Sequence, residues 1–139
     1  MSVVLCAVSD QPLDVAAHEA AAASAEGGAS VTFCGVVRRS DHGREVVELE
    51  YQAHPSAAEV LAGIAEKFAA EPDVLSVAVS HRAGTLGIGD VALVAVVLTA
   101  HRREAFEACA RLVEAVKHEL PVWKRQVFAD GTDEWVNCP

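Results

Sequence analysis

The longest apolar run of the chain is VALVAVVLTA, residues 91–100, and the other elements are most easily placed around it. A membrane-spanning helix needs roughly 20 apolar residues, so this run of ten, which includes Thr99, is too short to cross a bilayer. The run is rich in β-branched residues and has no polar alternation, which is typical of a buried strand. We therefore expect a buried strand over residues 90–99.

Outward from this run, strands and helices are interspersed along the chain. Apolar runs, alternating patterns and turn residues predict strands over residues 2–8, 29–37, 45–53 and 74–80, and a hairpin over residues 122–136 that turns at Asp130-Gly131. Apolar residues spaced by three and four predict helices over residues 13–25 and 55–71, and a longer one that starts near His101 and is stopped by Pro121. This order predicts a layered α+β fold with a mostly antiparallel or mixed sheet.

Two of these elements carry predictions about which side chains are buried. In residues 45–53 the apolar side chains of one face, Val47, Leu49 and Tyr51, alternate with the acidic Glu48 and Glu50. In the last helix, one stripe contains the apolar residues Phe106, Cys109, Leu112, Val113, Val116 and Leu120. Each pattern predicts one face toward the core and one toward solvent.

Length, composition and charge limit the class of protein. The chain has 139 residues, of which 52% are hydrophobic and 22% charged, and shows no repeat or linker, so a single folded domain over residues 1–139 is expected. A net charge of −9 argues against a general binder of nucleic acid or anionic membranes. The first nine residues contain no Lys or Arg, so they do not resemble a secretory signal, and a cytoplasmic location is expected.

The cysteines and histidines do not have the spacing of a metal site. The four cysteines, Cys6, Cys34, Cys109 and Cys138, are widely separated, which fits a reduced compartment. Cys34 and Cys109 lie in apolar segments and are interpreted as small core residues rather than nucleophiles. No metal is assigned to the histidines that we considered as ligands, His18, His54, His81 and His118.

The positive charges are concentrated near the last helix. Residues 101–125 carry six basic and four acidic groups, so a small anion would be drawn to this region of an acidic protein. His101 and Arg102 stand where the helix begins, and cations there oppose the helix dipole unless a phosphate or carboxylate compensates. The alternative is that the arginines point into solvent or pair with Glu104 and Glu107.

Two of the three lysines bracket the end of this helix. Helical spacing puts Lys117 at the edge of the apolar stripe, which predicts partial burial, and an amine with fewer waters around it is suited to general-base chemistry. Lys124 and Arg125 follow Trp123, and cations next to an aromatic ring suit a flat heterocycle carrying phosphate. The alternatives are a Lys117 stem that covers the edge of the core, a buried Trp123 and a solvated Lys124.

A third candidate lies where the strand over residues 29–37 enters a polar loop. Gly35 permits the close approach of a ligand or of another segment of backbone. Val36, Val37 and Arg38 follow, and Arg38 is a candidate anion contact. The alternative is that the glycine marks only a bulge.

Four segments together resemble one family. VTFCGVVR (residues 31–38), HRAGTLGIGD (81–90), LTAHRREAFEA (98–108) and PVWKR (121–125), with the helix that carries Lys117, are similar to the large, catalytic subunit of molybdopterin synthase, the MoaE family. The resemblance extends from about Gly28 to Val136. It implies an α/β-hammerhead type of α+β fold with an additional small antiparallel β subdomain.

The resemblance also implies an activity, partners and roles for residues. A homodimer would bind a small ubiquitin-like sulfur-carrier subunit on each protomer, giving a heterotetramer, and would act as a sulfurtransferase. Two sulfurs would pass from the carrier's C-terminal Gly-Gly thiocarboxylate to cyclic pyranopterin monophosphate, which becomes the dithiolene of molybdopterin, with no metal or other cofactor at this step. The catalytic residues would be Lys117 and Lys124, and the substrate would contact Val36, Val37, Arg38, His101, Arg102, Lys117, Lys124, Arg125 and Gln126.

The sequence departs from the family at two places, and two other functions are weighed against the first. Relatives commonly have Glu where this chain has Gln126, and the chain stops at Pro139 without the basic extension that contributes a pocket arginine in some relatives. One alternative is a non-catalytic module that binds a phosphorylated ligand or a ubiquitin-like partner. The other is a cysteine-dependent sulfurtransferase that uses Cys34 or Cys109.

Overall fold

The chain forms two sheets, and the buried strand expected over residues 90–99 lies in the larger of them. A computed structural model describes residues 2–137, so Met1, Cys138 and Pro139 lie outside the described residues. The strand order of the larger sheet is β1 (Ser2–Ser9), β5 (Val74–Arg82), β7 (Val91–Thr99), β2 (Ala29–Val36). β1 runs parallel to β5, and the other two pairs are antiparallel. The sheet is mixed, as the order of elements predicts.

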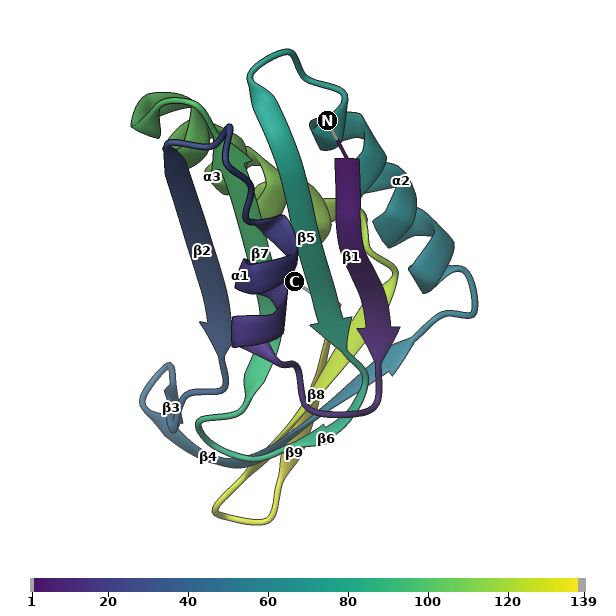
Figure 1. The fold of residues 1–139 in the computed structure, drawn as a ribbon. Coiled ribbons are helices and arrows are strands. Elements are labelled where there is room, and N and C mark those ends of the chain that lie inside the picture. The colour runs from purple at the N-terminus through teal and green to yellow at the C-terminus, as the bar shows by residue number, and fades with distance from the viewer. Residues whose placement is uncertain (1, 138–139) are drawn as a thin grey trace.

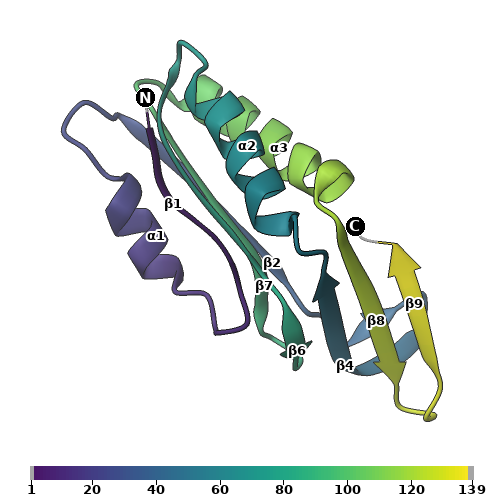
Figure 2. The same cartoon turned by 90° about the vertical axis from the view of Figure 1, so that its right-hand side faces the viewer.

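Helices cover both faces of this sheet. Helix α1 (Val15–Ala22) lies on one face, and α2 (Ala57–Ala69) and α3 (Arg102–Glu119) lie on the other (Figures 1 and 2). Because β7 has a strand on each side and helices above and below, every residue of it after Val91 is buried. The apolar run therefore lacks polar alternation because neither of its faces meets solvent.

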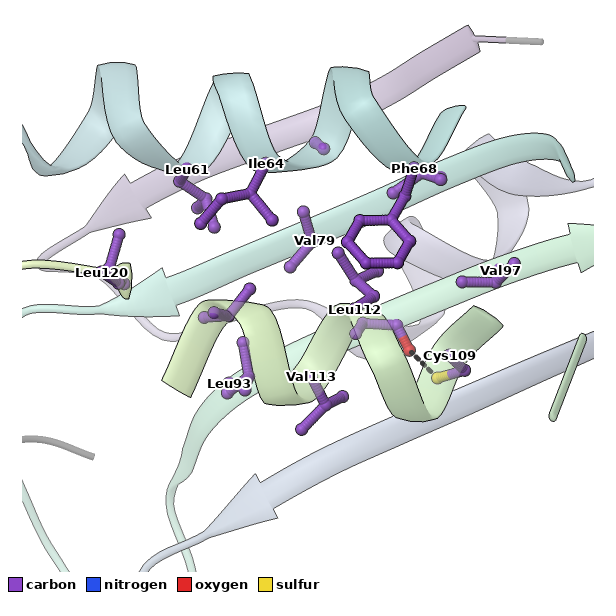
Figure 3. Packing of buried hydrophobic residues seen from close by; sticks show 14 of the residues in the cluster. Leu61, Ile64, Phe68, Val79, Leu93, Val97, Cys109, Leu112, Val113 and Leu120 are labelled. Atoms are coloured by element: carbon purple, nitrogen blue, oxygen red, sulfur yellow. Dashed lines mark hydrogen bonds between the residues drawn. The ribbon is translucent and has the colours of Figure 1, made fainter. Parts of the chain in front are cut away.

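The main core lies between the sheet and the α2–α3 layer. Leu61, Ile64 and Phe68 of α2 meet Leu112 of α3 above β5 and β7 (Figure 3). The Sγ atom of Cys109 points into the same layer, 3.9 Å from the carbonyl oxygen of Ala95. These apolar contacts fix where the last turn of α3 stands relative to the end of the sheet.

A second sheet continues from the ends of α2 and α3 (Figure 2). It has five strands but fewer residues in them than the first sheet, and is called the smaller sheet for that reason. Its order is β3 (Ser40–Asp41), β4 (Arg44–Ala53), β8 (Val122–Phe128), β9 (Asp133–Asn137), and β6 (Gly84–Leu86) also pairs with β4. All of these pairs are antiparallel. The expected α+β class, of the α/β-hammerhead type with a small antiparallel β subdomain, is confirmed.

The first helix is shorter than the predicted range of residues 13–25. Asp14 caps its start by accepting a hydrogen bond from the Ala17 amide at 2.9 Å, and Ala23 already has an extended backbone. The chain leaves the helix early because it must reach the end of β7, where the Gly28 N–H donates to the Thr99 carbonyl at 2.9 Å. A Cβ atom at Gly28 would collide with the backbone of residue 100, so this crossing depends on glycine.

Two predictions of side-chain burial were wrong. Phe106 is 62% exposed, because the buried face of α3 is centred on Ala105, Ala108 and Leu112, and Phe106 stands to one side of it. In β4 the pairing with β8 shifts register between Val46 and Glu48. This bulge makes Val46 the buried residue and leaves Val47 46% exposed, whereas alternation alone buries Val47.

The bulge leads to a stability prediction. Val46→Ala should lower the free energy of unfolding by about 2 kcal/mol, since it removes two buried methyl groups and leaves a cavity. Val47→Ala, the matched control one residue away, should change it by less than about 0.5 kcal/mol. Urea unfolding followed by circular dichroism measures both. The reverse ranking would show that the strand has no bulge in solution.

Candidate active site

A cavity of about 330 Å³ opens where the larger sheet meets the smaller one. Its walls come from the end of β2 and the loop after it, the start of β7, β4, β5, the last turn of α3 and β8. The apolar and aromatic part of the lining consists of Val36, Val37, Leu49, Tyr51, Ala92, Leu93, Val116, Leu120 and Val122. The remaining lining includes three cationic side chains and one carboxylate.

The three cations are Arg38, Lys117 and Lys124, which are far apart in the sequence. Lys117 lies in the last turn of α3, where the negative end of the helix dipole favours a cation. Lys124 lies on β8, and its side chain shares a face of that strand with Val122 and Gln126 because alternate residues point the same way. Of the expected substrate contacts, the structure thus brings together Val36, Val37, Arg38, Lys117, Lys124 and Gln126.

One of the two lysines, Lys117, is less buried than the sequence predicts. Lys124 is half-buried, but Lys117 is exposed rather than partly buried. The reason is position: Lys117 stands where α3 ends beside the open cavity, beyond the part of the helix that α2 and the sheet cover. Its side chain therefore borders the cavity and remains open to solvent.

Among the described residues that line the cavity, only Asp41 supplies a carboxylate. Its Oδ2 accepts a hydrogen bond from Nε2 of Gln126 at 2.9 Å, and its Oδ1 lies 3.4 Å from Nη2 of Arg38. The hydrogen bond from Gln126, together with the nearby charges of His42, Lys124 and Arg38, lowers the pKa of Asp41 below its usual value. Asp41 is therefore ionised at neutral pH, and with His81 neutral the lining carries a net charge of about +2.

His81 is a lining residue that the sequence reasoning missed. It is 6% exposed, its ring stands edge-on to Tyr51 with centroids 4.8 Å apart, and its Nδ1 donates to the Arg82 carbonyl at 2.7 Å. Burial, and secondarily the charge of Lys117, lower the pKa of His81. The imidazole is therefore neutral at pH 7, and because Nδ1 holds the proton, Nε2 has a free lone pair. His81 is the first residue of the HRAGTLGIGD segment, but no ligand or catalytic spacing marked it, and only its position in β5 at the cavity reveals it.

His101 and Arg102 are not part of this cavity. They line a separate shallow depression with Gly28, Ala100, Arg103 and Glu104, at the opposite end of α3 from Lys117. Lys117 lies fifteen positions after Arg102 in α3, a distance of about 22 Å along the helix. Within residues 2–137, neither Arg102 nor Arg103 forms an ion pair, so the pairing with Glu104 and Glu107 that the sequence allows is not observed.

Arg125 faces away from the cavity. It lies on the outer face of β8, where its Nε donates to Asp133 at 2.7 Å and its Nη1 lies 3.6 Å from Glu50. These two carboxylates raise the pKa of Arg125. Trp123 shares that outer face and is exposed, so it is not a core residue. Within one chain, Arg125 is therefore engaged by carboxylates on the other side of the sheet.

The cysteines of the described residues do not line the cavity. Burial raises the pKa of the Cys109 thiol to about 11, and burial also raises the pKa of Cys6 and Cys34, with smaller contributions from Glu66 and Glu19. A nucleophilic thiolate is thus disfavoured at each of the three positions. Cys138 lies outside the described residues.

Residues 2–137 contain neither a metal-binding cluster nor a membrane-spanning helix. No group of three or more His, Cys, Asp or Glu side chains has the arrangement to hold a metal ion. No helix is long and apolar enough to span a membrane.

Comparisons with known proteins define the class to which this fold and cavity belong. The family model described as MoaE protein matches residues 8–119. A molybdopterin synthase catalytic subunit 1 of Mycobacterium tuberculosis is 39% identical over 132 residues, which cover 94% of this chain and 89% of that protein. The molybdopterin synthase catalytic subunit of a Nostoc species is 37% identical over 133 residues, 94% of this chain and 81% of that protein.

A solved structure agrees with these sequences. The crystal structure of molybdopterin synthase from Staphylococcus aureus superposes with a TM-score of 0.84 at 28% identity and covers 96% of both chains. The chain belongs to the MoaE family, as its four motifs predict. The curated relatives are catalytic subunits of a sulfur-transferring enzyme, so the expected function is confirmed at the level of the family, and the non-catalytic alternative is not favoured.

Proposed function

We propose that this chain transfers sulfur from the C-terminal thiocarboxylate of a small ubiquitin-like carrier to cyclic pyranopterin monophosphate, forming the dithiolene of molybdopterin. The observation that carries the proposal is the cavity. Two of the three lysines and Arg38 line it, so it is a locally positive region of a protein whose net charge is −9. Such a cavity attracts a phosphorylated ring and a thiocarboxylate, both of which are anions.

The positions of the lining residues suggest a separate role for each of the three cations. Arg38, whose side chain is largely exposed and held by one long contact to Asp41, is free to turn to the cyclic phosphate. Lys117 stabilises the charge of the thiocarboxylate and polarises its acyl carbon when water releases the carrier as a carboxylate. Lys124 exchanges protons at the substrate carbons that receive sulfur. The apolar wall of β4, β7 and α3 accommodates the narrow Gly-Gly end of the carrier.

A homodimer reconciles the two separated groups of predicted substrate contacts. His101 and Arg102 stand at the far end of α3 from Lys117, too distant to reach the same ligand within one chain. We infer that each cavity is completed by His101 and Arg102 of the second protomer, whose unpaired guanidinium is available for the phosphate. With one carrier bound to each protomer, the assembly is a heterotetramer. We place this reaction in the cytoplasm.

Reconstitution tests this proposal directly. Purified protein is mixed with thiocarboxylated carrier and cyclic pyranopterin monophosphate, and the dithiolene product is measured after conversion to a fluorescent derivative. We expect product to form in proportion to the thiocarboxylate consumed. If both ligands bind and no dithiolene appears, the chain is a binding module and the proposal is wrong.

Cysteine variants in the same assay separate carrier-derived sulfur from a persulfide route. Cys34→Ser and Cys109→Ala should each retain activity within about twofold of wild type, because the thiols are outside the cavity and are held in their protonated form. Mass spectrometry of the protein after turnover should show no persulfide. A variant that loses activity while remaining folded would support the cysteine-dependent route.

A further inference from the structure

The pairing of Asp41 with Gln126 is unusual among the polar contacts of the cavity. Gln126 is 4% exposed, and its amide spans from β8 to the short strand β3 to donate to Asp41 at 2.9 Å. The two residues are 85 positions apart in the sequence, so the contact joins two edges of the cavity. A nearly buried amide that bonds to an ionised carboxylate is worth more than an exposed ion pair.

The backbone around Asp41 fixes where its carboxylate stands. His42 and Gly43 have positive φ values of 50° and 78°, which makes the tight turn between β3 and β4. The Val46 N–H also donates to the Arg39 carbonyl at 2.7 Å, which ties the base of this hairpin. Asp41 is thereby held in place, with a side chain 19% exposed, although it lies in a two-residue strand.

The carboxylate sets the orientation of Gln126 and offsets the charge of two cations. An ionised carboxylate offers only acceptors, so Gln126 must present its NH₂ group to Asp41, and the orientation of the amide is determined. Arg38 and Lys124 both experience the negative charge of Asp41, and without it three like charges would face one another across the cavity. Asp41 therefore organises the positive side of the cavity before any ligand enters.

We propose that Asp41 is a positioning residue for the sulfur-transfer reaction, and that Asp41 and Gln126 act as one carboxylate–amide unit that holds Lys124 and Arg38 ready for the substrate. This rests on the function proposed above and adds to it a residue outside the predicted set. Such a unit needs only one hydrogen bond between an amide and a carboxylate, and the single negative charge of that carboxylate. The charge can therefore be moved from one side of the bond to the other.

A charge-exchange experiment tests the unit. Four proteins are compared in the reconstituted assay: Asp41→Asn, Gln126→Glu, the double variant, and Asp73→Asn as a control that removes the same charge from an exposed position away from the cavity. For Asp41→Asn we expect kcat to fall about tenfold to a hundredfold, the effect of losing one charge-assisted hydrogen bond. We expect KM for the anionic substrate not to rise, because the cavity becomes more positive.

The double variant provides the decisive comparison. It restores an amide opposite a carboxylate, with the same net charge, and should recover at least about half of the wild-type kcat. Gln126→Glu alone places two carboxylates against each other and should be as slow as Asp41→Asn. The proposal is overturned if Asp41→Asn stays within about twofold of wild type, or if the double variant is no faster than Asp41→Asn.

A second measurement does not depend on turnover. The chain has three lysines, so their side-chain NMR signals are readily assigned by substitution. Asp41→Asn should move the Lys124 signal and leave that of Lys67, which lies on α2, unchanged, and the double variant should restore the Lys124 signal. An unmoved Lys124 signal would contradict the positioning role. Wild-type protein that makes no product would instead count against the proposed function, while the NMR result would still test the contact.

Discussion

Lys117→Ala is expected to reduce dithiolene formation by about a thousandfold, the largest loss from any single substitution in this chain. The amine stands at the mouth of the cavity, where α3 ends, and we assign it to the charge of the thiocarboxylate and of the acyl carbon during hydrolysis. Removing one donor that stabilises developing charge typically costs a factor of about 10² to 10³. Single-turnover assays with thiocarboxylated carrier measure this effect without a contribution from product release.

The other lysines provide a graded comparison. Lys124→Ala should lose activity by about a hundredfold, the usual range for a proton-transfer group, and Lys67→Ala should behave as wild type because Lys67 is on the exposed side of α2. Lys117 is exposed, and within residues 2–137 its side chain forms no ion pair, so the melting temperature should not change. Near-normal turnover by both cavity variants would refute their assignment.

Local patterns predicted most of the fold because they report directly on burial. The run in β7 is apolar on both faces since helices cover both, and the order of strands and helices was right except for the two short strands β3 and β6. The errors arose where tertiary contacts override a local period. Pairing with β8 inserts a bulge that turns Val47 outward, and the packing angle of α3 leaves Phe106 outside its stripe.

The site was predictable only in part, for a related reason. The sequence grouped Lys117 and Lys124 in one candidate site because they bracket the helix stop at Pro121. No local pattern gives His81 or Asp41 a chemical role. His81 becomes a functional candidate because β5 brings it to the cavity, and Asp41 because Gln126, 85 positions away, donates a hydrogen bond to it. The basic residues of segment 101–125, in contrast, are close in sequence but not in space. The length of α3 separates Arg102 from Lys117, and Arg125 lies on the opposite face of β8 from Lys124.

That division leads to a complementation experiment. Co-expression of Lys117→Ala and Arg102→Ala chains with different affinity tags, followed by two-step purification, isolates the mixed dimer. If each cavity takes Lys117 from one protomer and Arg102 from the other, one of the two cavities then has both residues intact. The mixed dimer should regain about half of the wild-type activity, whereas each variant alone should have almost none.

Two other arrangements of these residues predict different activities for the same proteins. If His101 and Arg102 act on a ligand of their own, the activity of a cavity depends on its Lys117 and not on Arg102. The Arg102→Ala protein would then be active by itself. If both residues served one cavity within a single chain, every site would carry one substitution and the mixed dimer would be inactive. Recovered activity in the mixed dimer, together with an inactive Arg102→Ala protein, can therefore arise only from a site that two protomers share, in agreement with the 22 Å estimated along α3.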